Sequence, residues 1–148
     1  MQAGSAGLAQ ASLRQALGGL RVRDVMTTEI TTVPADATVH DLIEDYFIRY
    51  TYGGYPVVSN GRVVGLVTLH ELRNTPPETR TATGVERVMV PLAPRLVVDP
   101  GTPVIDALNR MTTSGAGRLV VLDQDRLVGL ITANGILHLT QIRSALGG

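Results

Sequence analysis

The apolar positions of the chain follow a helical period and then two strand-like runs, and this order occurs twice. From Val39 to Tyr50, apolar and aromatic residues recur at i, i+3, i+4, i+7, i+8 and i+11, which predicts an amphipathic helix capped by Thr38. Asn60-Gly61 is the pair that a two-residue type I′ hairpin requires. The first half is therefore expected to contain an extended piece stopped by Pro34, a helix, two hairpin strands and a short helix, at residues 30–33, 38–50, 55–59, 62–68 and 69–73.

The second half repeats this order. Thr102 is expected to cap a helix with Pro103 at its first position, and Gly115 and Gly117 end that helix. The other expected elements are an extended piece, two strands around the loop Asp123-Gln124-Asp125, and a final helix, at residues 96–98, 119–122, 127–132 and 133–146. Met26 and Met89 are 63 residues apart, and Thr68 and Thr132 are 64 apart, which indicates a duplicated unit.

One segment follows the same pattern in both halves. Gly65-Leu66-Val67-Thr68-Leu69-His70-Glu71-Leu72 is matched by Gly129-Leu130-Ile131-Thr132-Ala133-Asn134-Gly135-Ile136. In each copy an apolar run ends at a threonine where a helical pattern begins. The start of a helix has unpaired N–H groups and the positive end of the helix dipole, so this junction is suited to an anion.

These patterns predict an α+β fold of two β-α-β-β-α repeats that pack as one module with pseudo-two-fold symmetry. A short entry helix precedes them, with Leu8, Ser12, Leu13, Ala16, Leu17 and Leu20 at helical spacing and Gly18-Gly19 at its end. The expected boundaries are 1–20 for the lead and entry helix, 21–73 for the first repeat, 74–83 for a linker and 84–148 for the second repeat.

Charge and composition exclude several classes of function. Thirteen basic and thirteen acidic side chains give no net charge, so a nucleic-acid surface is not expected. The chain has no cysteine, which excludes disulfides and thiolate metal sites. No apolar run is long enough to cross a bilayer, and residues 1–19 lack the features of a signal peptide, so a cytoplasmic location is expected.

The enzyme signatures that the sequence suggests are incomplete. His70-Glu71 begins like the zinc-peptidase motif His-Glu-x-x-His, but residue 74 is Asn. Gly115-Ala116-Gly117 precedes a strand and lacks the third glycine of a dinucleotide-binding motif. We therefore expect no catalytic residue, no metal site and no required cofactor in this chain.

The repeated order of strand, helix, hairpin, Gly-apolar-apolar-Thr and helix resembles a tandem pair of cystathionine-beta-synthase (CBS) domains, the Bateman module. The resemblance covers residues 21–146 and includes Asp24-Val25-Met26 and Val88-Met89. The end of the first-repeat helix, residues 46–50, and the segment 17–26 are similar to the cytosolic CBS pair of site-2-protease-type intramembrane zinc peptidases. This likeness implies a regulatory part attached to an enzyme or transporter, such as a membrane metalloprotease.

The resemblance also implies a ligand, namely AMP, ADP, ATP or S-adenosylmethionine, bound between the two repeats. Apolar residues at the extended pieces and second strands would form slots for a base, and each threonine would meet ribose or phosphate. The expected ligand contacts are Ile30, Val33, Tyr55, Pro56, Thr68, Glu71, Leu96, Val98, Arg118, Leu119 and Thr132. The further candidates for neutralising phosphates are His70, Arg73 and Arg87.

Two residues depart from the family pattern, in which an Asp three residues after the threonine accepts hydrogen bonds from both ribose hydroxyls. The matching residues are Glu71 and Gly135. Glu71 keeps the charge on a longer side chain, whereas Gly135 has no acceptor. Losing a charged acceptor costs about 1.5–3 kcal/mol, or roughly ten- to a hundredfold in affinity. We expect the site at Thr68 and Glu71 to bind ligand better than the site at Thr132.

Other interpretations of the same residues remain open. Thr68-x-x-Glu71 also matches a capping box, in which the two side chains satisfy backbone donors at a helix start, and Thr132 fits a simple N-cap. Tyr46, Phe47, Tyr50 and Met111 fit core or dimer contacts, and the arginines fit solvated surface charges. The alternative function is a structural dimerisation module that binds no nucleotide. With either function, a homodimer through the helical faces is expected.

Overall fold

The computed structural model describes residues 14–50 and 53–147, and the chain divides into two compact units. We call residues Ile30–Ala93 the inner unit, and the described residues up to Glu29 together with those from Pro94 the outer unit. Leu8, Ser12 and Leu13 of the expected entry helix lie outside the described residues. Residues 14–17 are helical, and Gly19, at φ +81°, follows this helix in the left-handed conformation expected of a C-terminal glycine.

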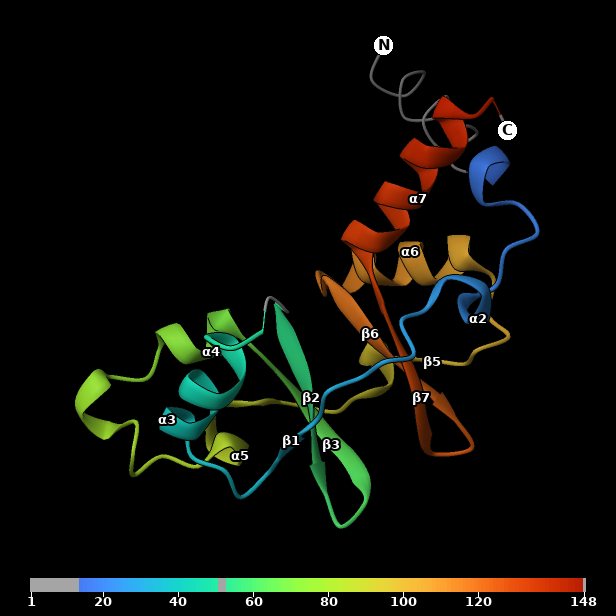
Figure 1. Ribbon diagram of the computed structural model, residues 1–148. Coiled ribbons are helices and arrows are strands. Elements are labelled where there is room, and N and C mark those ends of the chain that lie inside the picture. The colour runs from blue at the N-terminus through green and yellow to red at the C-terminus, as the bar shows by residue number, and fades with distance from the viewer. Residues whose placement is uncertain (1–13, 51–52, 148) are drawn as a thin grey trace. The chain divides into compact units, whose positions relative to one another are not determined.

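The inner unit consists of a four-stranded sheet and short helices (Figure 1). Strand β1 runs parallel to β2, and β2, β3 and β4 are antiparallel neighbours. The strands are β1 (Val33–Pro34), β2 (Gly54–Ser59), β3 (Arg62–Thr68) and β4 (Val90–Pro91). The helices are α3 (Val39–Leu42) with a π-helix (Ile43–Phe47), α4 (Leu69–Arg73), a 3₁₀ turn (Pro77–Thr79) and α5 (Val85–Val88). The bounds of β3 and α4 are those that the sequence predicts, whereas Pro34, expected to stop the first extended piece, lies inside β1.

The helix after Thr38 is not the continuous α-helix that its periodicity predicts. Thr38 caps it as expected, since Thr38 Oγ1 accepts from Asp41 N at 3.0 Å. The backbone hydrogen bonds of the helix then change to the i→i−5 pattern of a π turn, in which Ile48 N donates to Ile43 O at 3.0 Å. Within this turn the sequence neighbours Tyr46 and Phe47 both contact the ring of Tyr55 edge-on, at centroid distances of 5.5 and 5.0 Å. The π turn allows both rings to pack on one core residue, and this aromatic packing stabilises the irregular turn.

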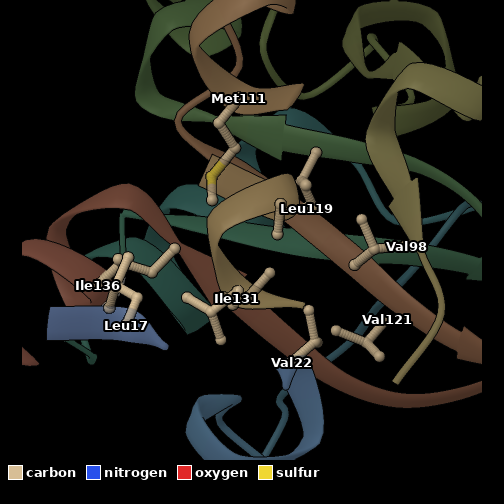
Figure 2. Close-up of a cluster of buried hydrophobic side chains, with 10 residues drawn as sticks. Leu17, Val22, Val98, Met111, Leu119, Val121, Ile131 and Ile136 are labelled. Atoms are coloured by element: carbon tan, nitrogen blue, oxygen red, sulfur yellow. The ribbon is translucent and has the colours of Figure 1, made fainter. Parts of the chain in front are cut away.

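The outer unit has a three-stranded sheet of the same topology, with β5 parallel to β6 and β6 antiparallel to β7. Its elements are α2 (Val22–Val25), a 3₁₀ turn (Pro94–Leu96), β5 (Val97–Val98), α6 (Val104–Ser114), β6 (Arg118–Asp123), β7 (Arg126–Thr132) and α7 (Ala133–Ala145). Its core gathers side chains from the entry helix, α2, the sheet, α6 and α7 (Figure 2). The predicted cap of α6 is wrong by one residue, because Pro103, with extended ψ 141°, is the N-cap and α6 begins at Val104.

Each unit contains the leading segment of the other repeat. The segment 21–29, which begins the first repeat in sequence, packs in the outer unit, where Thr27 N donates to Leu130 O at 2.8 Å and Leu130 N donates back at 3.0 Å. The segment 84–93, which begins the second repeat, packs in the inner unit, where β4 pairs with β3. Both exchanged segments therefore cover the outer edge of a hairpin strand, which would otherwise present unpaired backbone groups.

A methionine from each exchanged segment lies against a glycine of the strand that it covers. Met26 contacts Gly129, and Met89 contacts Gly65. A Cβ built on Gly65 would come within 2.6 Å of Val90 O and 2.7 Å of Met89 Sδ. The glycine in Gly-apolar-apolar-Thr is thus required by this close approach, a packing role that the sequence pattern alone does not reveal.

The two hairpins use the same two-residue turn with different residues. Asn60 and Gly61 have φ of 53° and 79°, which confirms the predicted type I′ turn. In the second hairpin Asp123 pairs with Arg126, so the turn is Gln124-Asp125 and the expected three-residue loop is one residue too long. Gln124 and Asp125 have φ of 50° and 67°, a conformation that costs non-glycine residues about 1–2 kcal/mol each.

Replacing Gln124-Asp125 by Asn-Gly is expected to raise the free energy of unfolding by about 1–2 kcal/mol, because both new residues tolerate positive φ. The matched control is the converse change of Asn60-Gly61 to Gln-Asp, which should lower stability by a similar amount. Among the described residues, no atom beyond its chain neighbours lies within 4 Å of a Cβ at Gly61, so the control tests backbone conformation without a clash. Urea unfolding measures both variants, and equal midpoints for all three proteins would contradict the expectation.

Candidate ligand-binding site

The inner strand–helix junction is built around Thr68, the last residue of β3 and the N-cap of α4. Its extended backbone, at φ −127° and ψ 175°, ends the strand and leaves the first N–H groups of α4 without helical partners. Thr68 Oγ1 accepts from His70 N at 3.2 Å. The junction is therefore stabilised by the side chain of the residue that the repeat pattern marks.

Glu71 completes a capping box at this junction. Its Oε1 accepts from Thr68 N at 2.6 Å and from Thr68 Oγ1 at 2.9 Å. The capping interpretation of Thr68-x-x-Glu71 is thus confirmed. In the described part of the chain no hydrogen bond to the other carboxylate oxygen, Oε2, is found, and the Glu71 side chain is half-buried. The carboxylate fixes the helix start and retains one oxygen as an acceptor.

The outer junction has the same backbone but no acid. Thr132 caps α7, with Oγ1 accepting from Gly135 N at 3.0 Å, as expected for a simple N-cap. Ala133 N donates to Gly117 O at 3.0 Å, which fixes the start of α7 to the residue before β6. A Cβ built on Gly135 would lie 2.9 Å from Thr132 Oγ1, so a side chain there requires this hydroxyl to move. The two junctions are thus alike in backbone and different in charge.

Most of the predicted apolar contacts are core side chains. Val33 and Tyr55 are buried in the core of the inner unit, and Val98 and Leu119 in the core of the outer unit. Tyr55 OH donates to Tyr46 O at 3.0 Å. Because these side chains pack inside their own units, their contribution to a base slot would come from their backbone groups. Of the other predicted contacts, Ile30 is half-buried before β1, Pro56 is buried within β2, and Leu96 is buried in the 3₁₀ turn before β5.

The predicted basic contacts differ in position. His70 and Arg73 are exposed on α4, and Arg87 is exposed on α5, all in the inner unit. Arg118 is half-buried at the start of β6, where its backbone pairs with Thr132. The inner unit therefore places a histidine and an arginine on the same short helix as Glu71, while the outer unit places one arginine beside its threonine.

Residues 14–50 and 53–147 contain neither a metal cluster nor a membrane-spanning helix. No cluster of His, Asp and Glu suited to a metal ion occurs there. None of the helices in these ranges has the length and apolar character needed to span a bilayer.

The CBS domain model matches residues 22–77 and 85–145. Rip3 of Mycobacterium tuberculosis, a protein named as a candidate zinc metalloprotease, is 32% identical over 133 residues, which are 88% of this chain and 34% of Rip3. The CBS domain-containing protein YhcV of Bacillus subtilis is 31% identical over 130 residues, covering 86% of this chain and 89% of YhcV. The chain thus spans about a third of the length of Rip3 and nearly all of YhcV.

Solved structures share the fold at low sequence identity. The CBS domain of a bacterial CNNM/CorC family Mg²⁺ transporter, solved in complex with ATP, matches with a TM-score of 0.78 and 19% identity, covering 89% of this chain and 94% of that one. The CBS pair of protein MJ0100, solved with 5-methylthioadenosine and S-adenosyl-L-methionine, matches with a TM-score of 0.73 and 18% identity, covering 84% and 98%. These matches confirm the α+β fold that the sequence predicts. They also confirm the more specific resemblance of this chain to the CBS pairs of zinc metalloproteases. The chain belongs to the CBS domain family and carries two copies of the domain in tandem.

Proposed function

We propose that this chain is a regulatory module that binds an adenosine-containing ligand, with the junction of Thr68 and Glu71 as its ribose contact. The observation that carries the proposal is the arrangement of Glu71, whose Oε1 is fixed by Thr68 while Oε2 remains an acceptor beside the helix start. A carboxylate oxygen held in this way is pre-organised to accept from a ribose hydroxyl. The complexes of related folds with ATP and with S-adenosyl-L-methionine support AMP, ADP, ATP or S-adenosylmethionine as the ligand class.

We propose the rest of the site from the likeness to the CBS family. Base contacts come from backbone groups at the β1 and β5 segments and at the starts of β2 and β6. Phosphates are neutralised by His70 and Arg73 on α4, and by Arg87 or Arg118. Thr132 supplies a hydroxyl without an acid, so the outer junction contributes less affinity than the inner one.

The proposed mechanism is linkage. A ligand that contacts both repeats favours the arrangement of the two repeats that it binds more tightly. The ligand can change the state of an attached partner only as far as its affinities for the two arrangements differ. Because Rip3 is about three times as long as the matched region, we propose a membrane metalloprotease as the attached partner and the cytoplasmic side as the location of this module. The chemistry of such a protein would lie outside these residues, so this chain acts without catalysis.

The alternative function is a structural dimerisation module without a nucleotide. It is favoured by the use of Glu71 Oε1 in the cap and by the absence of an acid at Gly135. A homodimer is supported by exposed apolar side chains, Leu69 on α4 and Leu137 on α7, each 46% exposed. Dimerisation fits both functions, so only ligand binding separates them.

A thermal-shift screen of the purified chain with AMP, ADP, ATP and S-adenosylmethionine tests the proposal, with GTP as the control. At a hundred times its dissociation constant a ligand adds about 2.7 kcal/mol of stability. We expect this shift with at least one adenosine compound and a smaller one with GTP. Equal melting temperatures with and without every adenosine compound at millimolar concentration would favour the dimerisation module.

A further inference from the structure

Met26 and Met89 occupy equivalent places in the two exchanged segments. Each is the C-cap of a one-turn helix, α2 or α5, and has an extended backbone there, with ψ of 151° and 157°. The next residue of each segment, Thr27 or Val90, pairs with the hairpin strand that the segment covers. The chain passes from one unit to the other directly after each segment. Both methionines therefore belong to the anchors of the two connections between the units.

The sulfur atom of each methionine fills the space that a side chain on the strand would take. A Cβ on Gly65 would lie 2.7 Å from Met89 Sδ, and the atom nearest to a Cβ on Gly129 is Met26 Sδ. Both methionine side chains are half-buried, whereas Met111 is 2% exposed in the core of the outer unit. Because oxidation of methionine depends on exposure, the first two are accessible to an oxidant and Met111 is protected.

We propose that Met26 and Met89 are sites of oxidation by hydroperoxides, and that their oxidation releases the exchanged segments. The thioether sulfur takes one oxygen of hydrogen peroxide: an S–O bond forms, the O–O bond breaks, the sulfur loses two electrons and the peroxide is reduced to water. The added oxygen is polar and enlarges the side chain at the atom that contacts the glycine. No room remains on the strand side of this contact, so the oxidised side chain has to turn towards solvent.

The backbone pairing of each segment on its strand is short. β4 consists of Val90 and Pro91, and Thr27 forms an isolated bridge with Leu130. Pairing of this length is marginal without side-chain packing. Oxidation should therefore loosen both segments, and reduction of the sulfoxides by methionine sulfoxide reductases with a dithiol should restore them. This effect does not depend on the proposed ligand.

Treatment of the full chain with hydrogen peroxide, followed by peptide mapping in a mass spectrometer, tests the selectivity. Met26 and Met89 should each gain one oxygen roughly tenfold faster than Met111. Hydrogen exchange measures the release. The amides of Thr27 and Leu92 both donate to hairpin strands, and they should exchange roughly tenfold faster in the oxidised chain. Equal oxidation rates at all three methionines, or unchanged exchange of both amides after complete oxidation, would overturn the proposal.

Leucine variants separate this effect from general oxidative damage. Met26→Leu/Met89→Leu keeps an apolar side chain of similar volume at both positions. Oxidation should lower the melting temperature of the native chain by about 3–6 °C and leave that of the double variant unchanged. Met111→Leu is the matched control and should lose as much as the native chain. If the double variant does not fold, each single variant should show about half of the native loss. A loss as large as the native one in the variants at positions 26 and 89 would assign the effect to other residues and contradict the proposal.

Discussion

Gly65→Ala is expected to lower the free energy of unfolding by about 2–3 kcal/mol, the upper part of the range of roughly 1–3 kcal/mol that is typical of overpacking. The added methyl group would lie 2.6 Å from Val90 O, and Val90 belongs to the strand β4 that pairs with β3. A backbone oxygen in a hydrogen-bonded ladder cannot move without separating the strands. The exchanged segment 84–93 would therefore be displaced from the inner unit. Chemical denaturation of the purified variant measures the loss.

Gly129→Ala is the matched control, because the equivalent contact involves only a side chain. A Cβ on Gly129 lies closest to Met26 Sδ and 2.8 Å from Met26 Cγ. A shorter side chain at residue 26 relieves this clash, so Met26→Ala should restore part of the stability of Gly129→Ala. Met89→Ala should not rescue Gly65→Ala, since the carbonyl remains. Equal rescue in both double-mutant cycles would contradict the assignment of the first clash to the backbone.

Glu71→Gln is expected to weaken binding of the adenosine ligand by roughly tenfold and to leave stability close to that of the native chain. Glutamine retains an oxygen that can accept from Thr68, so the capping box persists, but the charged acceptor for ribose is lost. Glu71→Ala removes both functions. It should weaken binding by roughly ten- to a hundredfold and lower stability by about 1 kcal/mol. Calorimetric titration and urea unfolding measure the two quantities separately.

A second capping box in the inner unit provides a control for the loss of stability expected of Glu71→Ala. Asp41 forms the same kind of capping box with Thr38, in which Thr38 N donates to Asp41 Oδ2 at 3.3 Å. Asp41→Ala should cost a similar free energy of unfolding and leave ligand affinity unchanged. If Glu71→Gln and Asp41→Ala both bind ligand like the native chain, Glu71 is a cap only, and the proposed ribose contact is wrong.

The regular elements could be predicted from the sequence because their signals are local. Asn60-Gly61 determines its turn, and the apolar run that ends at Thr68 determines β3. Local signals do not determine the π turn at Ile43–Phe47, where two aromatic neighbours pack on the distant Tyr55. They also miss the exchange of leading segments, because pairing between residues such as Thr27 and Leu130 depends on contacts far apart in sequence.

The sequence predicts which residues lie at the candidate site better than it predicts what each of them does. The repeat identified Thr68 and Thr132, and both are the helix caps that their position predicts. The apolar residues chosen for a base slot, such as Val33 and Leu119, are in the cores, since sequence alone does not tell the ligand-facing side of a strand from its core side. The double hydrogen bond from Thr68 to one oxygen of Glu71 depends on a rotamer, which no sequence pattern specifies.

Titration of the native chain with ATP, AMP and S-adenosylmethionine in a calorimeter is the most direct test of the central claim. We predict that at least one of them binds with one equivalent per chain, because only the junction of Thr68 and Glu71 has an acid. The same titration of Glu71→Gln should give the weaker affinity described above. No heat of binding from any of the three at millimolar concentration would contradict the ligand-sensing function.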